Sequence, residues 1–447
     1  MIKKNFPTFG TVISTFILIY IFYKSEIFYN GEKRDYYVTY YILSLITLIF
    51  FISIYFVGDK IRTYLIIIFV SFFISFYSFE VFITFIYDHE LNKIRTYKKI
   101  TGKEFELRSK LEVFNDLKKY EKKIKLITPP NRIWDYQNED IFPLSGISNS
   151  KTINCNENGF YSSYISDRYG FNNPDSEWDS KLVEYVIIGD SFAHGSCVNR
   201  PTDVASVIRH LSNKSVLNLG YGGTGPLTQY ATLREYLKKD VKKILLLYYE
   251  GNDISNLKTE MQNQTLIKYL DDQNYSQNLI TKQKTIDKLL NQHLLTAEVI
   301  ADDKIEEISL QSKIIKIIKL SNTRGKLNLL LNKKNKPHFS SSDELQLGDF
   351  AKLVKLILEI SNRNNAEFYF VYLPEFARYV LNYDQESYFR VKSILKELNI
   401  PLIDIHEELF SKQNDPLTFF PFRSDGHYTV EGYEKLGQII YKFTNKN

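Results

Sequence analysis

The stretch "VEYVIIGDSFAHGS", residues 183–196, decides the fold. Its apolar, β-branched run at residues 186–188 stops abruptly at Gly189-Asp190-Ser191, and the residues that follow are typical of the start of a helix. This pattern predicts a buried strand that carries Ser191 to the edge of a sheet. Ligands of open α/β sheets bind beyond the carboxyl ends of parallel strands, so Ser191 is a candidate nucleophile. The alternative is a strand-ending turn in which Asp190 or Ser191 caps a helix.

Two further buried strands are expected after it, and each ends in residues suited to binding. The strand at residues 215–219 runs into "GYGGTGP", whose glycines let backbone N–H groups approach an anion or oxyanion closely. A phosphate loop is the rival interpretation, but the Gly-Lys-Ser/Thr signature is missing. The strand at residues 243–249 runs into "EGND", where the Asn252 amide could donate to an oxyanion or simply form an Asn-Asp turn.

Strand and helix patterns alternate through the rest of the chain. Further helices are expected at residues 227–238, 349–361 and 388–398, and further strands at residues 367–372 and 402–405. Such alternation is typical of βαβ units, and it predicts an α/β fold with a parallel sheet covered by helices on both faces.

A second reactive candidate lies near the C-terminus, in "RSDGHYTVEGYEKLG" at residues 423–437. His427 is a natural general base, and Asp425, two residues earlier, could accept a hydrogen bond from the imidazole and fix its tautomer. A plain surface turn is the alternative. The chain order Ser, Asp, His is shared with other α/β hydrolases, although "GDSFAHG" does not match their Gly-x-Ser-x-Gly elbow.

Residues 1–87 differ in composition from the rest of the 447-residue chain. Three apolar, aromatic-rich runs at residues 9–23, 36–57 and 64–87 predict three transmembrane helices, the first of them short. Lys3 and Lys4 before the first run resemble the start of a signal peptide, but no small-residue cleavage site follows, which favours a retained anchor. The alternative is a soluble helical bundle. Glu80 is the main charge within the third run.

The remaining regions are predicted as follows. Residues 88–130 have a charged helical pattern that indicates a stalk or linker, and residues 131–447 would form the catalytic domain. Within it, the loop-rich stretch at residues 156–175 carries no recognisable chemistry by itself. Residues 258–349 are polar with helical patches and would be an insertion: a lid, a surface for a partner protein or a solvated helical excursion.

The net charge and the cysteine content exclude few classes of function and do not settle the cellular compartment. A formal net charge of +5 is small for this length, so it gives no reason to expect nucleic-acid binding. The two cysteines, Cys155 and Cys197, could pair in an oxidising compartment, but the sequence alone does not decide whether they do.

Four blocks, taken in order, resemble the signature of the SGNH (GDSL-type) hydrolases: Gly189-Asp190-Ser191, residues 218–223, Gly251-Asn252-Asp253 and Asp425-Gly426-His427. The match covers the chain from residue 183 to the C-terminus, with residues 258–349 and the membrane segment outside it. The resemblance implies a flavodoxin-like three-layer α/β/α domain that hydrolyses esters or transfers acyl groups without a metal or other cofactor.

By position, the resemblance makes Ser191 the nucleophile, His427 the base and Asp425 the residue that orients it. The Ser191 N–H, the Gly223 N–H and Asn252 would form the oxyanion hole. In one departure, many members place two residues between the aspartate and the histidine, whereas here only Gly426 intervenes. Asp425 is therefore the least well matched of these residues.

Together the blocks and the apolar runs predict a membrane-anchored esterase or O-acyltransferase that acts on an ester, with acetyl as the expected group, of a carbohydrate or surface glycan. Its partners would be the lipid bilayer and that substrate. A different class of function is also open, a non-catalytic glycan-binding or assembly module on the same fold.

Two arguments about the side of the membrane oppose each other. With three spans, the positive charges fall into two sets: Lys3, Lys4, Lys60 and Arg62 on one side, and Lys24, Lys33, Arg34, Lys93, Arg95, Lys98, Lys99 and Lys103 on the other. Counting them favours a cytoplasmic catalytic domain. Resemblance to anchored enzymes of exported glycans, and the Lys3-Lys4 pair before the first span, favour the outside, which is the expectation adopted.

Overall fold

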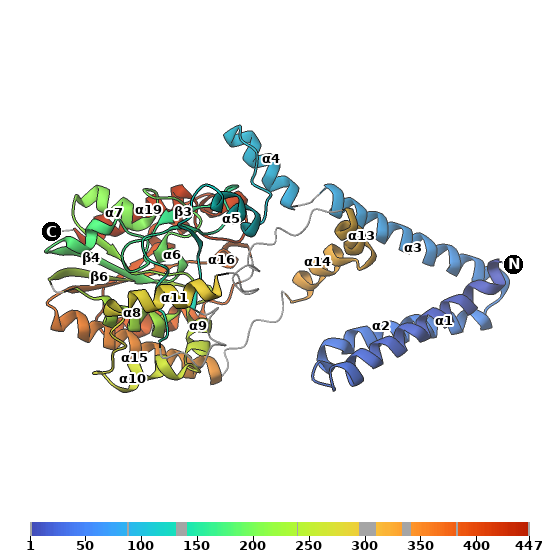
Figure 1. Cartoon of the computed structure of the whole chain (residues 1–447). Coiled ribbons are helices and arrows are strands. Elements are labelled where there is room, and N and C mark those ends of the chain that lie inside the picture. The colour runs from blue at the N-terminus through green and yellow to red at the C-terminus, as the bar shows by residue number, and fades with distance from the viewer. Residues whose placement is uncertain are drawn as a thin grey trace. The chain divides into compact units, whose positions relative to one another are not determined.

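The computed structural model forms two compact units, one made of Met1–Asp88 with Ser309–Asn328 and the other of His89–Ile308 with Leu329–Asn447 (Figure 1). Each unit is described by itself. The structure describes residues 2–86, 89–130, 141–238, 240–294, 310–332, 341–380 and 383–445.

The first unit is helical. Its helices α1 (Ile2–Phe22), α2 (Arg34–Ser53) and α3 (Asp59–Ile86) contain three stretches long and apolar enough to cross a membrane, Asn5–Phe28, Arg34–Phe56 and Asp59–Phe85. A single π-helical turn, η1 (Tyr23–Phe28), extends the first, and a 3₁₀ turn, η2 (Ile54–Phe56), extends the second. The first stretch is thus longer than the short run expected from the sequence, at 24 residues against the roughly 20 that a bilayer core needs.

Two helices from the middle of the chain, the second of them only as far as Asn328, belong to this helical unit. They are α13 (Leu310–Ile318) and α14 (Ser321–Asn332), and α13 packs against α3 (Figure 1). Their residues fall within the 258–349 segment that the sequence predicts as an insertion of the catalytic domain.

The second unit contains a five-stranded, all-parallel sheet. Its strand order is β5 (Val216–Asn218), β4 (Val183–Gly189), β6 (Val241–Tyr249), β7 (Glu367–Leu373) and β8 (Leu402–Asp404). This is the 2-1-3-4-5 order of flavodoxin-like folds, in which ligands bind where the strand order reverses. The reversal lies beside β4, the strand that leads to Ser191.

Helices cover both faces of this sheet, so the central strands β4 and β6 are buried on both sides. One core contains residues of β4, β6 and β7 with α8 (Pro226–Tyr236), α15 (Ser341–Arg363) and α17 (Glu386–Glu397). The opposite core contains the alternate strand residues with α7 (Val204–Ser212) and α19 (Val430–Thr444). Figure 1 shows the two groups of helices on opposite sides of the strands. The predicted three-layer α/β/α domain is therefore confirmed.

Residues 89–130 do not form the separate stalk that the charge pattern predicts. They contain α4 (His89–Thr101), α5 (Lys110–Lys118) and β1 (Ile124–Leu126), and they belong to the α/β unit. Strand β1 pairs with β2 (Lys151–Ile153), which pairs with β3 (Ser163–Ile165). Val113 and Phe114 of α5 are buried in the main core. Part of the apolar pattern between the charges therefore belongs to the core, whereas Leu107 and Leu117 are exposed.

The first part of the predicted insertion likewise packs on the domain. Helix α9 (Asp253–Glu260) leads into it, and helices α10 (Gln264–Asp271) and α11 (Gln283–His293) place Leu266, Tyr269, Ile286 and Leu290 in the main core. Residues 295–309 and 333–340 of the insertion, and residues 131–140 at the start of the predicted catalytic domain, lie outside the described residues. Short helices and 3₁₀ turns complete the unit: α6 (Ser191–His194), α16 (Ala377–Val380), α18 (Ile405–Glu408), η4 (Asp175–Asp179), η5 (Leu279–Thr281), η7 (Phe410–Lys412), η8 (Pro416–Phe419) and η9 (Pro421–Arg423).

Candidate active site

Ser191 lies at the carboxyl end of β4, as the sequence predicts. It begins α6, whose N-terminus is capped by the buried Asp190, which accepts a hydrogen bond from the Phe192 N–H at 2.9 Å. Gly189 has a φ of +154°, and a Cβ atom there would lie 2.6 Å from the Leu247 carbonyl oxygen. The turn therefore requires glycine at this position, and it presents the half-buried Ser191 side chain at the sheet edge.

The His427 imidazole contacts Ser191. Its Nε2 atom lies 2.8 Å from Ser191 Oγ, although the two residues are 236 positions apart in the chain. The ring also packs on Phe192, with 4.8 Å between ring centroids. His427 lies in the turn before α19, and Thr429 caps that helix by accepting from the Gly432 N–H. The structure thus brings the predicted nucleophile and the predicted base into hydrogen-bond contact.

The carboxylate on the other ring nitrogen belongs to Glu157 and not to Asp425. Glu157 Oε1 lies 2.9 Å from His427 Nδ1, and Glu157 Oε2 accepts from the His427 backbone N–H at 2.6 Å. Asp425 is exposed and makes no hydrogen bond to His427 among the described residues. The structure therefore corrects the expectation that Asp425 orients the imidazole.

The reason for the correction lies at Gly426. A Cβ atom on this residue would lie 2.7 Å from Glu157 Oε2, so the turn wraps directly around the Glu157 carboxylate. Because the one residue between Asp425 and His427 is a glycine without a Cβ, the Glu157 carboxylate can approach the imidazole. Glu157 falls in the stretch in which the sequence showed no chemistry. The signals that could have pointed to it are the short Asp-to-His spacing and the cysteine two residues before it.

Glu157 and His427 shift each other's proton affinity. Burial lowers the pKa of His427, but the charge and hydrogen bond of Glu157 outweigh it, and the pKa of His427 is raised above its usual value. Burial raises the pKa of Glu157, and the charge and hydrogen bonds of His427 outweigh it in turn, leaving the pKa of Glu157 lowered. The arrangement holds an ionised carboxylate behind a basic imidazole, as a catalytic triad does.

Cys155 and Cys197 form a disulfide beside this pair. Cys197 Sγ lies 3.4 Å from His427 Nδ1, and the Asn158 side chain donates to the Cys197 carbonyl oxygen at 2.9 Å. The disulfide therefore ties the segment that carries Glu157 to the segment that follows Ser191. It also accounts for a cluster of three potential metal ligands, Cys155, Cys197 and His427, because bonded sulfur atoms offer no thiolate to a metal.

The glycine-rich loop after β5 lies beside Ser191. The Tyr221 N–H and the Thr224 hydroxyl donate to the Gly189 carbonyl oxygen at 3.2 and 3.3 Å. A Cβ atom on Gly222 would lie 3.8 Å from the Ser191 Cβ. Gly223, the predicted oxyanion donor, follows with a φ of +73°. The loop that contains it is thus held next to the nucleophile.

The far end of the same loop is not open to an external anion. Gly225, Leu227 and Thr228 donate their N–H groups to the buried Glu260 carboxylate at 2.6, 2.9 and 3.3 Å. Burial raises the pKa of Glu260 to about 7, against these hydrogen bonds, which lower it. Glu260 therefore occupies the N-terminus of α8, a position that could otherwise bind phosphate.

Asn252 also reaches the site. Burial raises the pKa of Asp190 to about 6, while hydrogen bonds from the Phe192 N–H, Asn252 and Ser191 lower it. The Asn252 side chain thus lies beside Asp190, next in sequence to the nucleophile. Its Oδ1 atom is buried without a hydrogen-bond partner among the described residues. The third predicted oxyanion donor is therefore near Ser191 as well.

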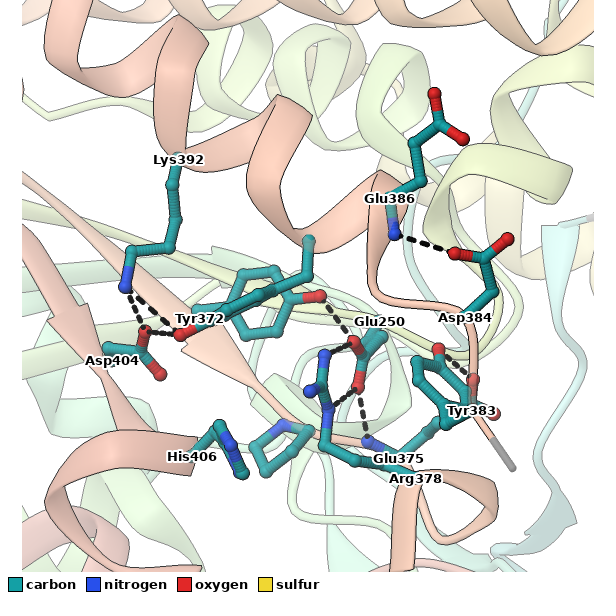
Figure 2. A network of polar contacts seen from close by, with 12 residues as sticks. Glu250, Tyr372, Glu375, Arg378, Tyr383, Asp384, Glu386, Lys392, Asp404 and His406 are labelled. Atoms are coloured by element: carbon teal, nitrogen blue, oxygen red, sulfur yellow. Dashed lines mark hydrogen bonds and ion pairs between the residues drawn. The ribbon is translucent and has the colours of Figure 1, made fainter. Parts of the chain in front are cut away.

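A buried charge network fixes the strand ends around Asn252 (Figure 2). Glu250 forms an ion pair with Arg378, and their side chains are 2% and 3% exposed. Glu250 also accepts from the Tyr372 hydroxyl at 2.6 Å and from the Glu375 N–H at 3.1 Å. Because Glu250 immediately precedes Gly251-Asn252, the network joins the end of β6 to the loop after β7 and restricts where Asn252 can lie.

A cavity of about 890 Å³ lies next to the Glu157 and His427 segments, between α4 and the turns before α19. Its lining includes Asn158, which follows Glu157, and Thr429, which lies two residues after His427. Tyr97 and Phe422 supply aromatic surface. Phe422 has a φ of +54°, a conformation that is costly for an aromatic residue and typical of functional sites.

No family model matches the chain, and no curated protein matches it. Two solved structures are similar to it, each with a TM-score of 0.32. One is described as a lipolytic protein of the G-D-S-L family from Desulfitobacterium hafniense DCB-2, with 16% identity over 58% of this chain and 98% of that chain. The other is the acetyl xylan esterase AlAXEase, with 10% identity over 58% of this chain and 99% of that chain.

The chain's own structure is more informative. Its sheet has the flavodoxin-like strand order, and the residues of the four sequence blocks follow β4, β5 and β6 and precede α19 at one end of that sheet. The second unit therefore has the flavodoxin-like three-layer α/β/α fold that the resemblance implies.

Proposed function

We propose that the protein is a membrane-anchored serine esterase or O-acyltransferase that acts on an O-acyl group, most simply acetyl, of a carbohydrate or surface glycan. One observation carries the proposal: Ser191 Oγ, His427 and Glu157 form a continuous line of contacts of 2.8 and 2.9 Å. This is the geometry of a nucleophile, a base and the acid that orients the base.

In the proposed mechanism, His427 Nε2 takes the Ser191 proton while Ser191 Oγ attacks the ester carbonyl carbon. The oxyanion would accept from the Ser191 N–H, the Gly223 N–H and the Asn252 amide, each worth about 3 kcal/mol in comparable sites. His427 then returns the proton to the departing alcohol oxygen, which leaves an acyl-Ser191 ester. Water or a sugar hydroxyl, deprotonated by His427, then attacks the carbonyl carbon of that ester. The bond to Ser191 Oγ breaks, the acyl group leaves on the attacking oxygen, and His427 returns the proton to Ser191 Oγ.

The Ser191→Ala variant tests the chemistry. With a short-chain chromogenic ester, it should lose activity by about 10⁶-fold, because the oxyanion donors alone cannot replace a nucleophile. Circular dichroism would check that the variant is folded. A fluorophosphonate probe should label the wild type and not the variant. An unlabelled wild type that binds glycan would instead favour the non-catalytic binding module.

Hydrolysis and transfer differ only in which acceptor reaches the acyl-enzyme. The cavity beside His427 combines aromatic side chains with hydroxyl and amide groups, and polar groups in an apolar pocket are the usual means of orienting a small ligand. Acylated oligosaccharide, detected by mass spectrometry after a glycan acceptor is added, would establish transfer. Release of free acid alone, at all acceptor concentrations, would establish hydrolysis.

We further propose that the three apolar helices cross the bilayer and that the catalytic unit lies outside the cytoplasm. The disulfide between Cys155 and Cys197 supports this placement, because disulfides persist in oxidising compartments. An alkaline phosphatase fusion after Lys125 in a bacterial host should be active, since that reporter needs its own disulfides. An inactive fusion together with an active cytoplasmic reporter at the same junction would place the unit inside.

A further inference from the structure

Glu80 is a fully buried carboxylate on α3, within about two helical turns of the end of a candidate membrane span. It accepts from the Asn322 and Thr323 backbone N–H groups at 3.0 and 2.8 Å and from the Thr323 hydroxyl at 2.5 Å. The Asn322 side chain also donates to the Thr84 hydroxyl at 3.0 Å. These contacts join the third apolar helix to a segment more than 200 residues later in the chain.

These contacts give hydrogen-bond partners to two kinds of group that are unfavourable to bury unpaired, the Glu80 carboxylate and the first N–H groups of α14. A carboxylate in a membrane span is unfavourable unless its lone pairs are taken by protein donors. The first N–H groups of a helix have no partner within that helix, and Asn322 and Thr323 lie in the first turn of α14. Glu80 is therefore the N-terminal cap of α14, and it fixes where the chain returns to the helical unit.

The preceding helix, α13, carries an apolar face that protein does not cover. Ile314, Ile315 and Ile318 are 46%, 43% and 65% exposed. Lys313, Lys316 and Lys319 recur at a spacing of three residues on the other side, and Lys313 Nζ lies 5.4 Å from the centroid of the Phe85 ring on α3. Apolar and basic residues are thus separated on this helix, as in helices that lie in a membrane interface.

We propose that residues 310–328 form a membrane-interface element, docked on α3 through Glu80, with the isoleucine face of α13 in contact with lipid. The occupant of that face is the bilayer because the same helical unit exposes many large apolar residues along α3, including Ile74 and Phe82. The lysines suit anionic headgroups at the same depth. The chain then contacts the membrane a second time, through a segment far along the sequence from its N-terminal helices.

This proposal rests on the proposed membrane insertion of α3, so the two are tested separately. The two cysteines of the chain are paired, which lets a single introduced thiol be labelled in the full-length protein with a nitrobenzoxadiazole fluorophore. Labels at Phe72→Cys on α3, at Ile318→Cys and at Lys319→Cys would be compared in phosphatidylcholine–phosphatidylglycerol vesicles. Brominated lipid and aqueous iodide serve as the two quenchers.

Brominated lipid should quench the Ile318→Cys label several-fold more than the Lys319→Cys label, and iodide should show the reverse order. If Phe72→Cys is in lipid but Ile318→Cys is quenched by iodide alone, the interface element is overturned while the membrane anchor stands. Protection of Ile318→Cys from both quenchers would mean that protein covers this face, which also overturns the proposal. A Phe72→Cys label outside lipid would refute the anchor itself.

The docking contact has its own test in the same vesicles. Adding Glu80→Ala should increase iodide quenching of the Ile318→Cys label several-fold and leave the Phe72→Cys label unchanged. Thr323→Val, which removes one donor and keeps the shape of the side chain, should give a smaller increase in the same direction and serves if Glu80→Ala does not fold. No change in either variant would show that Glu80 does not hold the segment.

Discussion

Each unit of the molecule contains a carboxylate whose hydrogen-bond partners lie far away in the sequence. Comparing the two shows which of these contacts has a structural role alone and which belongs to the proposed chemistry. Glu80 in the helical unit accepts from two backbone N–H groups and a hydroxyl. Glu157 in the α/β unit accepts from one backbone N–H group and an imidazole. Only the imidazole gains and loses a proton near neutral pH. A carboxylate that bonds to a distant segment therefore fixes a helix in one unit, and in the other it sets the protonation of the proposed base.

The largest predicted difference between the two carboxylates concerns catalysis. Glu157→Gln should lower kcat by about 10³ to 10⁴-fold, because a neutral amide neither stabilises the imidazolium nor selects the required tautomer. The measurement is ester turnover by the full-length protein in detergent, with folding checked by circular dichroism.

Glu80→Gln is the matched control, since it makes the same change in the other unit. Its side-chain oxygen can still accept from the α14 N–H groups, so turnover of a soluble ester should stay near the wild-type value. Equal losses in the two variants would show that Glu157 acts only on folding and would end its assignment to the site.

Much of the α/β unit could be predicted because its signals are local. A strand buried on both faces has an apolar run, and the polar residues that end it remain beside it in the fold, so Ser191 and Asn252 could be placed from short stretches. His427 was found in the same way, from the turn that precedes the last helix. The parallel order of the sheet followed from the alternation of strands and helices.

Glu157 could not be found in this way because its role depends on a contact across 270 residues. A glutamate in a loop rich in polar residues has no periodic signature, and Asp425 stood closer to His427 in the sequence. The place of residues 310–328 was missed for the same reason, since only the fold brings Thr323 to Glu80. Residues 89–130 have the charged pattern of a stalk, and nothing in the sequence indicated that Val113 and Phe114 among them pack in the core of the α/β unit.

A second, smaller effect is expected from the disulfide that positions Glu157. Replacing both cysteines, as Cys155→Ser with Cys197→Ser, should lower kcat by up to about 100-fold, because a carboxylate displaced by about 1 Å orients the imidazole poorly. KM should change little. No disulfide positions Glu80. If Ile318→Cys is added to the double serine variant and labelled, iodide quenching of that label should therefore be the same as in the protein with the disulfide.

Incubating the wild type with dithiothreitol should reproduce the loss, and reoxidation should reverse it. Full activity of the double serine variant would mean that the hydrogen bonds of Asn154 and Asn158 suffice to hold the Glu157 segment.

The smallest expected effect is the clearest test of which acid controls His427. A protonated His427 cannot accept the Ser191 proton, so kcat/KM should fall as the pH drops through the pKa of His427. Burial lowers this pKa, and Glu157, then Asp190, then Asp425 raise it to a net value above the usual one. Both Glu157→Gln and Asp425→Asn should therefore lower the pKa of His427, the first by more than the second.

For Asp425→Asn, kcat at the plateau should stay close to that of the wild type, and the acid limb of kcat/KM should move slightly to lower pH. Water screens this exposed charge, so the shift should also shrink as salt is added. For Glu157→Gln, whose turnover is too slow for a full profile, the ring carbon signals of His427 can be titrated by NMR. A larger shift in the pKa of His427 for Asp425→Asn than for Glu157→Gln would return Asp425 to the role that its place in the sequence suggests, and would mean that the contact between Glu157 and the imidazole does not persist in solution.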